Sequence, residues 1–162
     1  MTTFTCTTTD ESQTHALGVA LGERLRAGDV IELIGELGAG KTRLVRGIAQ
    51  GAGHDPDLVS SPTYVLFNEY RSPSAATILH IDAYRMSSPD EFRDSGYDRA
   101  APGAAVLTEW ADRIAGALDS GAARIEIHHD GDEHTDTKRF FQFTCPEPLR
   151  DRLAPAFATI QT

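Results

Sequence analysis

A glycine-rich stretch in the first third of the chain carries the clearest chemical pattern. Gly35-Glu36-Leu37-Gly38-Ala39-Gly40-Lys41-Thr42 has a glycine, four residues and then Gly-Lys-Thr. Glycines let a backbone curl so that successive N–H groups point at phosphate oxygens, and a following helix adds partial positive charge. A lysine there supplies a point charge for the outer phosphates, and a threonine hydroxyl is placed to ligate Mg²⁺. The stretch therefore predicts a P-loop in which a nucleotide is bound by Glu36, Leu37, Gly38, Ala39, Gly40, Lys41 and Thr42.

A P-loop also needs a carboxylate that holds the metal, and such a residue usually follows a neighbouring strand. Two acids are placed in this way. Asp82 ends the apolar run 77–81, and Glu109 ends the apolar run 104–108. Both are candidates for the magnesium site, against the alternative that each is an ordinary solvated acid.

Other parts of the sequence help to decide which class of P-loop protein this is. Guanine-specific switches usually carry an Asn-Lys-x-Asp base reader, but the single asparagine here is Asn68, and it is in no such motif. GTP is therefore disfavoured. Small-molecule kinases of this class usually have an arginine-bearing lid, and the segment 90–99, with Arg93 and Arg99, is a candidate for one. A kinase remains the alternative at this point.

The elements around these residues follow an alternating order. The apolar run 30–34 predicts a strand before the loop, and 42–50 predicts a helix after it. A turn around 72–74 predicts a hairpin, and Asp130-Gly131 predicts a second one. The remaining expected elements are strands at 63–70, 77–81, 104–108, 124–129 and 138–144, with helices from about 89 and at 110–118.

The two ends of the chain carry weaker signals. The threonine-rich start is a candidate edge strand, and Asp10 with Gln13 resembles a capping box for a helix that ends at Gly28. Leu149 and Leu153 recur at helical spacing in the tail, although Pro155 is expected to interrupt that helix. Alternating strands and helices with hairpins predict an α/β fold, a P-loop NTPase three-layer α/β/α sandwich with a mixed central sheet.

Composition limits the class of protein further. With 162 residues, 40% of them hydrophobic, the chain fits one domain spanning 1–162. Its net charge of −9 argues against tight binding of nucleic acid by the chain alone, which needs a basic surplus. No apolar run approaches membrane-spanning length and no lysine or arginine precedes Arg24, so we expect no membrane segment and a cytoplasmic location. Cys6 and Cys145 are expected to be reduced and buried.

Four motifs in order resemble the TsaE (YjeE) family of tRNA threonylcarbamoyladenosine biosynthesis ATPases. They are the P-loop, then Ser61-Pro62-Thr63-Tyr64, then His80-Ile81-Asp82-Ala83-Tyr84-Arg85, then Glu109-Trp110. The likeness runs from the strand before Gly35 through Trp110, and four ordered motifs are more specific than a P-loop alone. Glu36, where aspartate is commoner, is a mild departure.

The resemblance implies an ATPase, slow alone and dependent on partners, that uses ATP and Mg²⁺. It would assist the complex that installs threonylcarbamoyl on the adenosine beside the anticodon of tRNAs reading codons that begin with A. The implied partners are TsaB and TsaD, with TsaC supplying threonylcarbamoyl-adenylate. Contact with tRNA would be indirect, through that complex.

The resemblance also assigns roles to residues. It places Thr42 and Glu109 on magnesium, with Asp82 nearby acting on water or metal. The catalytic set is Asp82, Lys41 and Thr63, the last in a switch loop that senses the γ-phosphate; the alternative for that loop is a proline-fixed turn.

Three further features near or beyond these motifs have more than one interpretation. Arg85 faces phosphate, a partner or only solvent. Trp110, the single tryptophan, stacks near the site, docks a partner or covers the core. The histidine-rich run 128–134 suggests a metal site, but its spacing fits no usual pattern, and a polar hairpin turn explains it.

Overall fold

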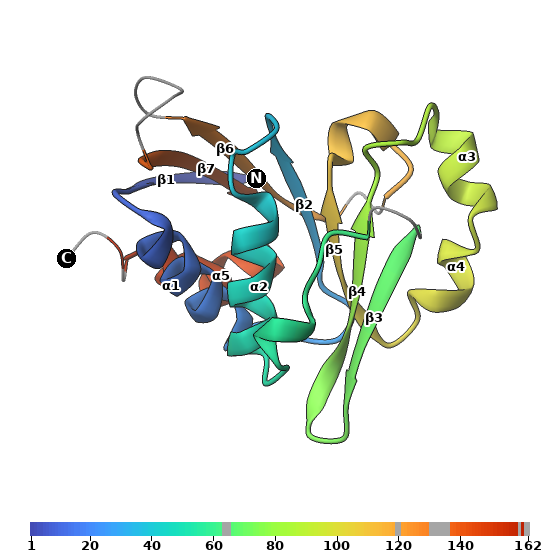
Figure 1. Ribbon diagram of the computed structural model, residues 1–162, viewed down its shortest axis with the longest axis horizontal. Coiled ribbons are helices and arrows are strands. Elements are labelled where there is room, and N and C mark those ends of the chain that lie inside the picture. The colour runs from blue at the N-terminus through green and yellow to red at the C-terminus, as the bar shows by residue number, and fades with distance from the viewer. Residues whose placement is uncertain (63–65, 119–120, 130–136, 159, 161–162) are drawn as a thin grey trace.

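The computed structural model describes residues 1–62, 66–118, 121–129, 137–158 and 160 of the chain. Their centre is a seven-stranded sheet in the order β1-β7-β6-β2-β5-β4-β3 (Figure 1). The strands are β1 (Thr2–Thr8), β2 (Val30–Gly35), β3 (Phe67–Ser72), β4 (Ala75–Asp82), β5 (Ala104–Glu109), β6 (Ala123–His129) and β7 (Arg139–Cys145).

The sheet is mixed, as the sequence predicts. β2 runs parallel to both β5 and β6, and β5 runs parallel to β4. β1 with β7, β6 with β7 and β3 with β4 are antiparallel pairs. Because the three parallel strands β2, β5 and β4 are neighbours, their carboxyl ends meet at one edge. Glu109 at the end of β5 is paired with Leu33 on one side and with Asp82 on the other.

Helices cover both faces of the sheet, which gives three layers (Figure 1). The longer helices α1 (Glu11–Gly22), α2 (Lys41–Gly51) and α5 (Glu147–Ala158) share one core cluster with the inward side chains of the sheet. The opposite cluster lies under the short α3 (Pro89–Asp94), α4 (Tyr97–Ala100) and the 3-10 turn η2 (Ala111–Ile114). β5 is buried along its whole length, as a central parallel strand must be.

Glycines allow α1 and α2 to touch along their backbones. A Cβ added at Gly18 would lie 2.6 Å from the Leu44 carbonyl oxygen, and one at Gly47 would lie 2.4 Å from the His15 carbonyl oxygen. Real Cβ atoms do not come so close, so only glycine permits this approach. The contact holds α2, whose first residues are Lys41 and Thr42, firmly against the rest of the fold.

Most expected elements are confirmed. β1 is an edge strand, the Asp10 side chain accepts from the Gln13 N–H at the start of α1, and β3–β4 and β6–β7 are antiparallel pairs. Both cysteines are free and buried. No helix in the described ranges has the length and apolar character needed to cross a bilayer.

Three expectations about elements were wrong in detail, and part of a fourth lies outside the described residues. α1 ends at Gly22 rather than at Gly28. The helix predicted at 110–118 is only the short 3-10 turn η2, because Trp110 adopts a left-handed backbone (φ 58°, ψ 38°) and Gly116 another (φ 80°). α5 continues through Pro155 to Ala158. β3 begins at Phe67, and residues 63–65 of the strand expected at 63–70 lie outside the described part of the chain.

Candidate functional site

The predicted P-loop lies between β2 and α2, where a phosphate cradle must lie. Gly38 and Gly40 have φ values of 79° and 102°, which side chains on L-residues rarely tolerate, and Gly40 is the residue that caps α2. Gly35 is needed for another reason, since a Cβ there would lie 2.6 Å from the Ile127 carbonyl oxygen. The loop is thus shaped by its glycines, and the helix N-terminus behind it favours an anion.

Lys41 is held at the mouth of this loop. Its side chain is almost fully buried, and Nζ donates to the carbonyl oxygens of Gly35 (2.6 Å) and Glu36 (2.8 Å). The ammonium also lies over the Trp110 ring, 3.8 Å from its centroid. Burial lowers the pKa of Lys41, while nearby carboxylates, Glu109 foremost, act in the opposite direction. Because the Lys41 ammonium is largely shielded from water, pairing with a phosphate would cost it little further desolvation.

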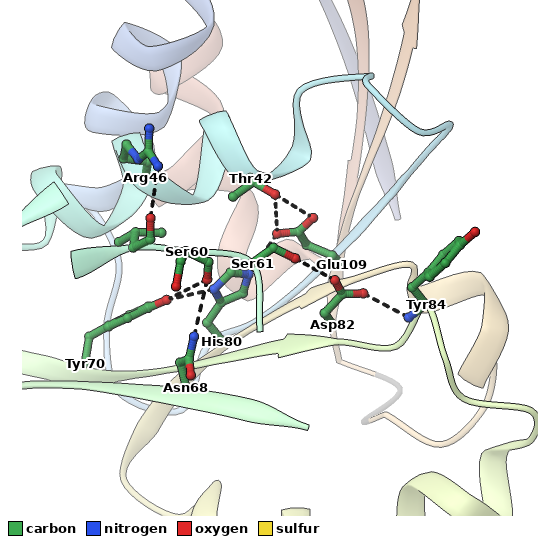
Figure 2. A network of polar contacts seen from close by, with 11 residues as sticks. Thr42, Arg46, Ser60, Ser61, Asn68, Tyr70, His80, Asp82, Tyr84 and Glu109 are labelled. Carbon is green, nitrogen blue, oxygen red and sulfur yellow. Dashed lines mark hydrogen bonds and ion pairs between the residues drawn. The ribbon is translucent and has the colours of Figure 1, made fainter. Parts of the chain in front are cut away.

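Thr42, at the start of α2, contacts Glu109, at the end of β5 (Figure 2). The position of Glu109 at a strand end predicted that it would lie beside the P-loop. The Thr42 hydroxyl donates to both carboxylate oxygens of Glu109, at 3.0 Å and 3.1 Å. Glu109 is only 3% exposed, yet it lies beside the loop that carries Thr42. A hydroxyl and a carboxylate are hard oxygen ligands of the kind that Mg²⁺ prefers. The donor set therefore fits the metal, and the Glu109 carboxylate also acts electrostatically on the Lys41 ammonium.

Asp82 joins the segment after the 3-10 turn η1 (Pro56–Leu58) to the site. Its Oδ2 accepts from the Ser61 hydroxyl at 2.7 Å, and its Oδ1 accepts from the Tyr84 N–H at 2.9 Å (Figure 2). Ser61 thus lies at the carboxyl edge of the sheet beside the P-loop, as a switch segment would. Thr63, which the resemblance places in the catalytic set, lies outside the described residues.

Trp110 links several of these groups. Its ring lies 4.9 Å from the Tyr84 ring, between centroids, and the Arg113 guanidinium stacks over both aromatic rings. It also packs against the core cluster on the α3 side. Trp110 therefore both covers the core and contacts the lysine of the P-loop. Arg85 is exposed just beyond Tyr84.

Sequence reasoning assigned no role to several residues that build the site. His80 Nε2 lies 2.8 Å from Glu109 Oε1, and His80 Nδ1 lies 2.9 Å from the Tyr70 hydroxyl. Arg139, from β7, donates to the carbonyl oxygens of Gly38 and Ala39 in the P-loop. A histidine inside an otherwise apolar strand was an available signal for His80. Arg139 is about 100 residues from the loop, and nothing local in the sequence connects the two.

Two other features have structural contacts away from the loop or fall outside the described ranges. Arg93, proposed for a kinase lid, donates to Asp90 and to the Gly116 carbonyl oxygen. The second contact ties α3 to the segment just after η2 rather than to the P-loop. Residues 130–136, most of the histidine-rich run, lie outside the described part of the chain. Among the described residues no group of three or more His, Cys, Asp and Glu is arranged to hold a metal.

Comparisons with known proteins agree with these motifs. Residues 8–140 match the family model described as "Threonylcarbamoyl adenosine biosynthesis protein TsaE". The tRNA threonylcarbamoyladenosine biosynthesis protein TsaE of Rickettsia conorii is 31% identical over 157 residues, covering 90% of this chain and 89% of that one. Its namesake in Bacillus subtilis is 36% identical over 127 residues, 78% of each chain. The crystal structure of Bacillus subtilis YdiB superposes with a TM-score of 0.76 at 25% identity, covering 99% of this chain and 97% of that one.

Proposed function

Because the chain belongs to the TsaE family of threonylcarbamoyl adenosine biosynthesis proteins, we propose that it serves that pathway as a magnesium-dependent ATPase. The observation that carries the proposal is the hydrogen bonding between Thr42 of the P-loop motif and the Glu109 carboxylate. The Thr42 hydroxyl donates to Glu109 at the mouth of a glycine-shaped loop whose lysine is desolvated. This is the arrangement that phosphoryl transfer needs, since its catalysis is positioning and charge stabilisation.

Each residue has a distinct task in this proposal. Backbone N–H groups of the loop 36–42 receive the phosphates, and Lys41 leaves its carbonyl partners to pair with them. Thr42 and Glu109 hold Mg²⁺, which when bound neutralises charge that develops on the phosphate oxygens. Asp82, placed by Ser61 and Tyr84, orients the attacking water. Thr63 would add a hydroxyl from the switch segment that Ser61 anchors.

The proposal makes the chain an accessory rather than the transferring enzyme. We propose that it works with TsaB and TsaD in the cytoplasm, with TsaC supplying threonylcarbamoyl-adenylate, and that hydrolysis resets the complex. A net charge of −9 suits a protein that leaves tRNA to its partners.

ATP hydrolysis by this chain, alone and with a TsaB–TsaD pair, tests the proposal. We expect slow hydrolysis by the chain alone and a changed rate with the pair, because partner contacts would position the switch segment. A fast rate that is indifferent to the pair would contradict the accessory role. Phosphorylation of a small acceptor by the chain alone would instead support the kinase.

A further inference from the structure

A buried chain of hydrogen bonds leads away from the proposed magnesium ligand. His80 Nε2 lies 2.8 Å from Glu109 Oε1, and His80 Nδ1 lies 2.9 Å from the Tyr70 hydroxyl (Figure 2). His80 is fully buried and Tyr70 is 8% exposed. This series of hydrogen bonds crosses three adjacent strands of the sheet, from Glu109 on β5 through His80 on β4 to Tyr70 on β3.

The register of these strands explains how the groups meet. Side chains alternate along β4, so His80 and Asp82 point to the same face as Ile78, which belongs to the core under α2. β3 and β4 are paired with Tyr70 opposite Ile78 and Asn68 opposite His80. Tyr70 is thus one diagonal step from His80 on the same face, within reach of an aromatic side chain.

The direction of each hydrogen bond follows if Glu109 is ionised and His80 is neutral. A metal-binding carboxylate only accepts, so His80 Nε2 must carry the proton in its bond to Glu109. In a neutral imidazole Nδ1 is then an acceptor, and the Tyr70 hydroxyl donates to it. That hydroxyl is also 3.5 Å from the Ser60 carbonyl oxygen, which is the longer of these two contacts. Burial raises the pKa of Tyr70, which keeps the proton available.

Glu109 needs a donor of this kind. Its carboxylate is buried, and among the described residues its other side-chain donor is the Thr42 hydroxyl, which is itself proposed as a magnesium ligand. His80 is therefore the side-chain donor that orients the carboxylate without also binding the metal. Such partners of a ligand fix its orientation and raise metal affinity.

We propose that His80 is a positioning residue that holds Glu109 in the orientation for Mg²⁺, and that Tyr70 fixes the His80 tautomer. The inference rests on the proposed magnesium-dependent ATPase. It adds two residues, neither of which touches nucleotide or metal, to the site. Their removal should therefore weaken metal binding while leaving the phosphate cradle of 35–42 in place.

Three substitutions, His80→Gln, His80→Asn and His80→Leu, separate hydrogen bonding from packing. A glutamine side chain would carry an amide N–H near the place of Nε2, whereas asparagine reaches only the place of Nδ1 and leucine has no donor. The assay is binding of a fluorescent ATP analogue, with Mg²⁺ titrated against EDTA, beside thermal melting. Thr108→Val is the matched control, because Thr108 is buried on β5 and its hydroxyl has no hydrogen-bond partner among the described residues.

We expect His80→Leu and His80→Asn to raise the Mg²⁺ concentration needed for tight binding by about 10- to 100-fold. Binding in EDTA should be unchanged, and His80→Gln should recover most of the metal affinity. Tyr70→Phe removes one oxygen atom and should shift the Mg²⁺ requirement in the same direction, by less. If His80→Leu does not fold, Tyr70→Phe and His80→Gln still decide the matter.

Wild-type Mg²⁺ dependence in His80→Asn and Tyr70→Phe would overturn the inference while leaving the proposed function intact. Equal losses in His80→Gln and His80→Leu would also overturn it, because the donor would then be irrelevant. If the wild-type chain binds the analogue without any Mg²⁺ dependence, the proposed function fails, and this inference fails with it.

Discussion

At the scale of single residues, Glu109 and Asp82 stand side by side at the carboxyl edge of the sheet but have different surroundings. Glu109 is buried and bonded to Thr42 and His80. Asp82 is half-buried and bonded to Ser61 and the Tyr84 backbone. One carboxylate faces the hydroxyl of Thr42, and the other faces Ser61, in the segment that we propose as a switch. Substitution of Glu109 and substitution of Asp82 should therefore cause different defects, although the two residues are neighbours in the sheet.

Glu109→Ala should weaken the Mg²⁺ dependence of nucleotide binding, because a metal ligand is lost. Asp82→Ala should leave that dependence in place and lower turnover by about 100-fold or more, because water is no longer oriented. Nucleotide titrations at several Mg²⁺ concentrations, beside steady-state hydrolysis rates, measure both. Identical defects in the two variants would contradict the division of roles.

Trp110 has a left-handed backbone, the only non-glycine residue with positive φ among those described. Trp110→Ala should cost about 2 kcal/mol of unfolding free energy, because the Lys41 and Tyr84 contacts are lost. Trp110→Gly loses the same contacts but suits this conformation, so it should be about 1 kcal/mol more stable than the alanine variant. Urea unfolding of both variants tests this, and a less stable glycine variant would speak against it.

At the scale of elements, the position of α2 determines where Lys41 and Thr42 lie. α2 is held by its backbone contact with α1, which depends on glycines in both helices. The contact also explains why a chain should keep poor helix formers such as Gly47 in the middle of a helix. A change that separates α1 from α2 should therefore also displace Lys41 and Thr42 in the site.

Gly47→Ala should destabilise the fold by on the order of 3 kcal/mol, although alanine is the better helix former. The reason is that its Cβ would lie 2.4 Å from the His15 carbonyl oxygen. Ser12→Ala, at an exposed position of α1, is the control and should be nearly neutral. Thermal melting compares the two, and an equally mild effect of Gly47→Ala would show that the helices are free to separate.

The elements also show what the sequence can predict. The P-loop, the strand ends at Asp82 and Glu109 and the antiparallel pairs β3–β4 and β6–β7 were predictable, because hydrophobic period, turn residues and motifs are local signals. The turn expected at 130–131 lies outside the described residues. The Tyr70–His80–Glu109 chain was not predictable, since it depends on the register of β3 with β4 and the parallel pairing of β4 with β5. The helix expected at 110–118 failed because apolar spacing does not reveal the left-handed turn at Trp110.

At the scale of the whole molecule, the core cluster on the side of α1, α2 and α5 covers the cysteines at the β1–β7 edge of the sheet. Burial raises the pKa of the Cys6 thiol to about 11 and that of Cys145 in the same direction. The folded state therefore keeps a neutral thiol where the unfolded chain ionises near pH 9. The contribution of the buried Cys6 thiol to the free energy of unfolding is therefore fully present below pH 9. It is lost as the pH rises from about 9 to about 11.

The native protein should accordingly react slowly with a thiol reagent at pH 8, with both thiols reacting at once in urea. A chromogenic disulfide reagent gives the rates. Rapid reaction of both thiols in the native protein would show that this edge of the sheet opens readily.

The central claim is that the loop 35–42 binds ATP through Lys41 with Mg²⁺ held beside it. Calorimetric titration of ATP, with Mg²⁺ and with EDTA, into wild type, Lys41→Ala and Lys138→Ala tests it most directly, since Lys41 and Lys138 are the chain's only lysines. We expect Mg²⁺-dependent binding by wild type and Lys138→Ala, and none by Lys41→Ala, because backbone N–H groups alone do not balance the phosphate charge. Equal ATP affinity in all three proteins would contradict the account.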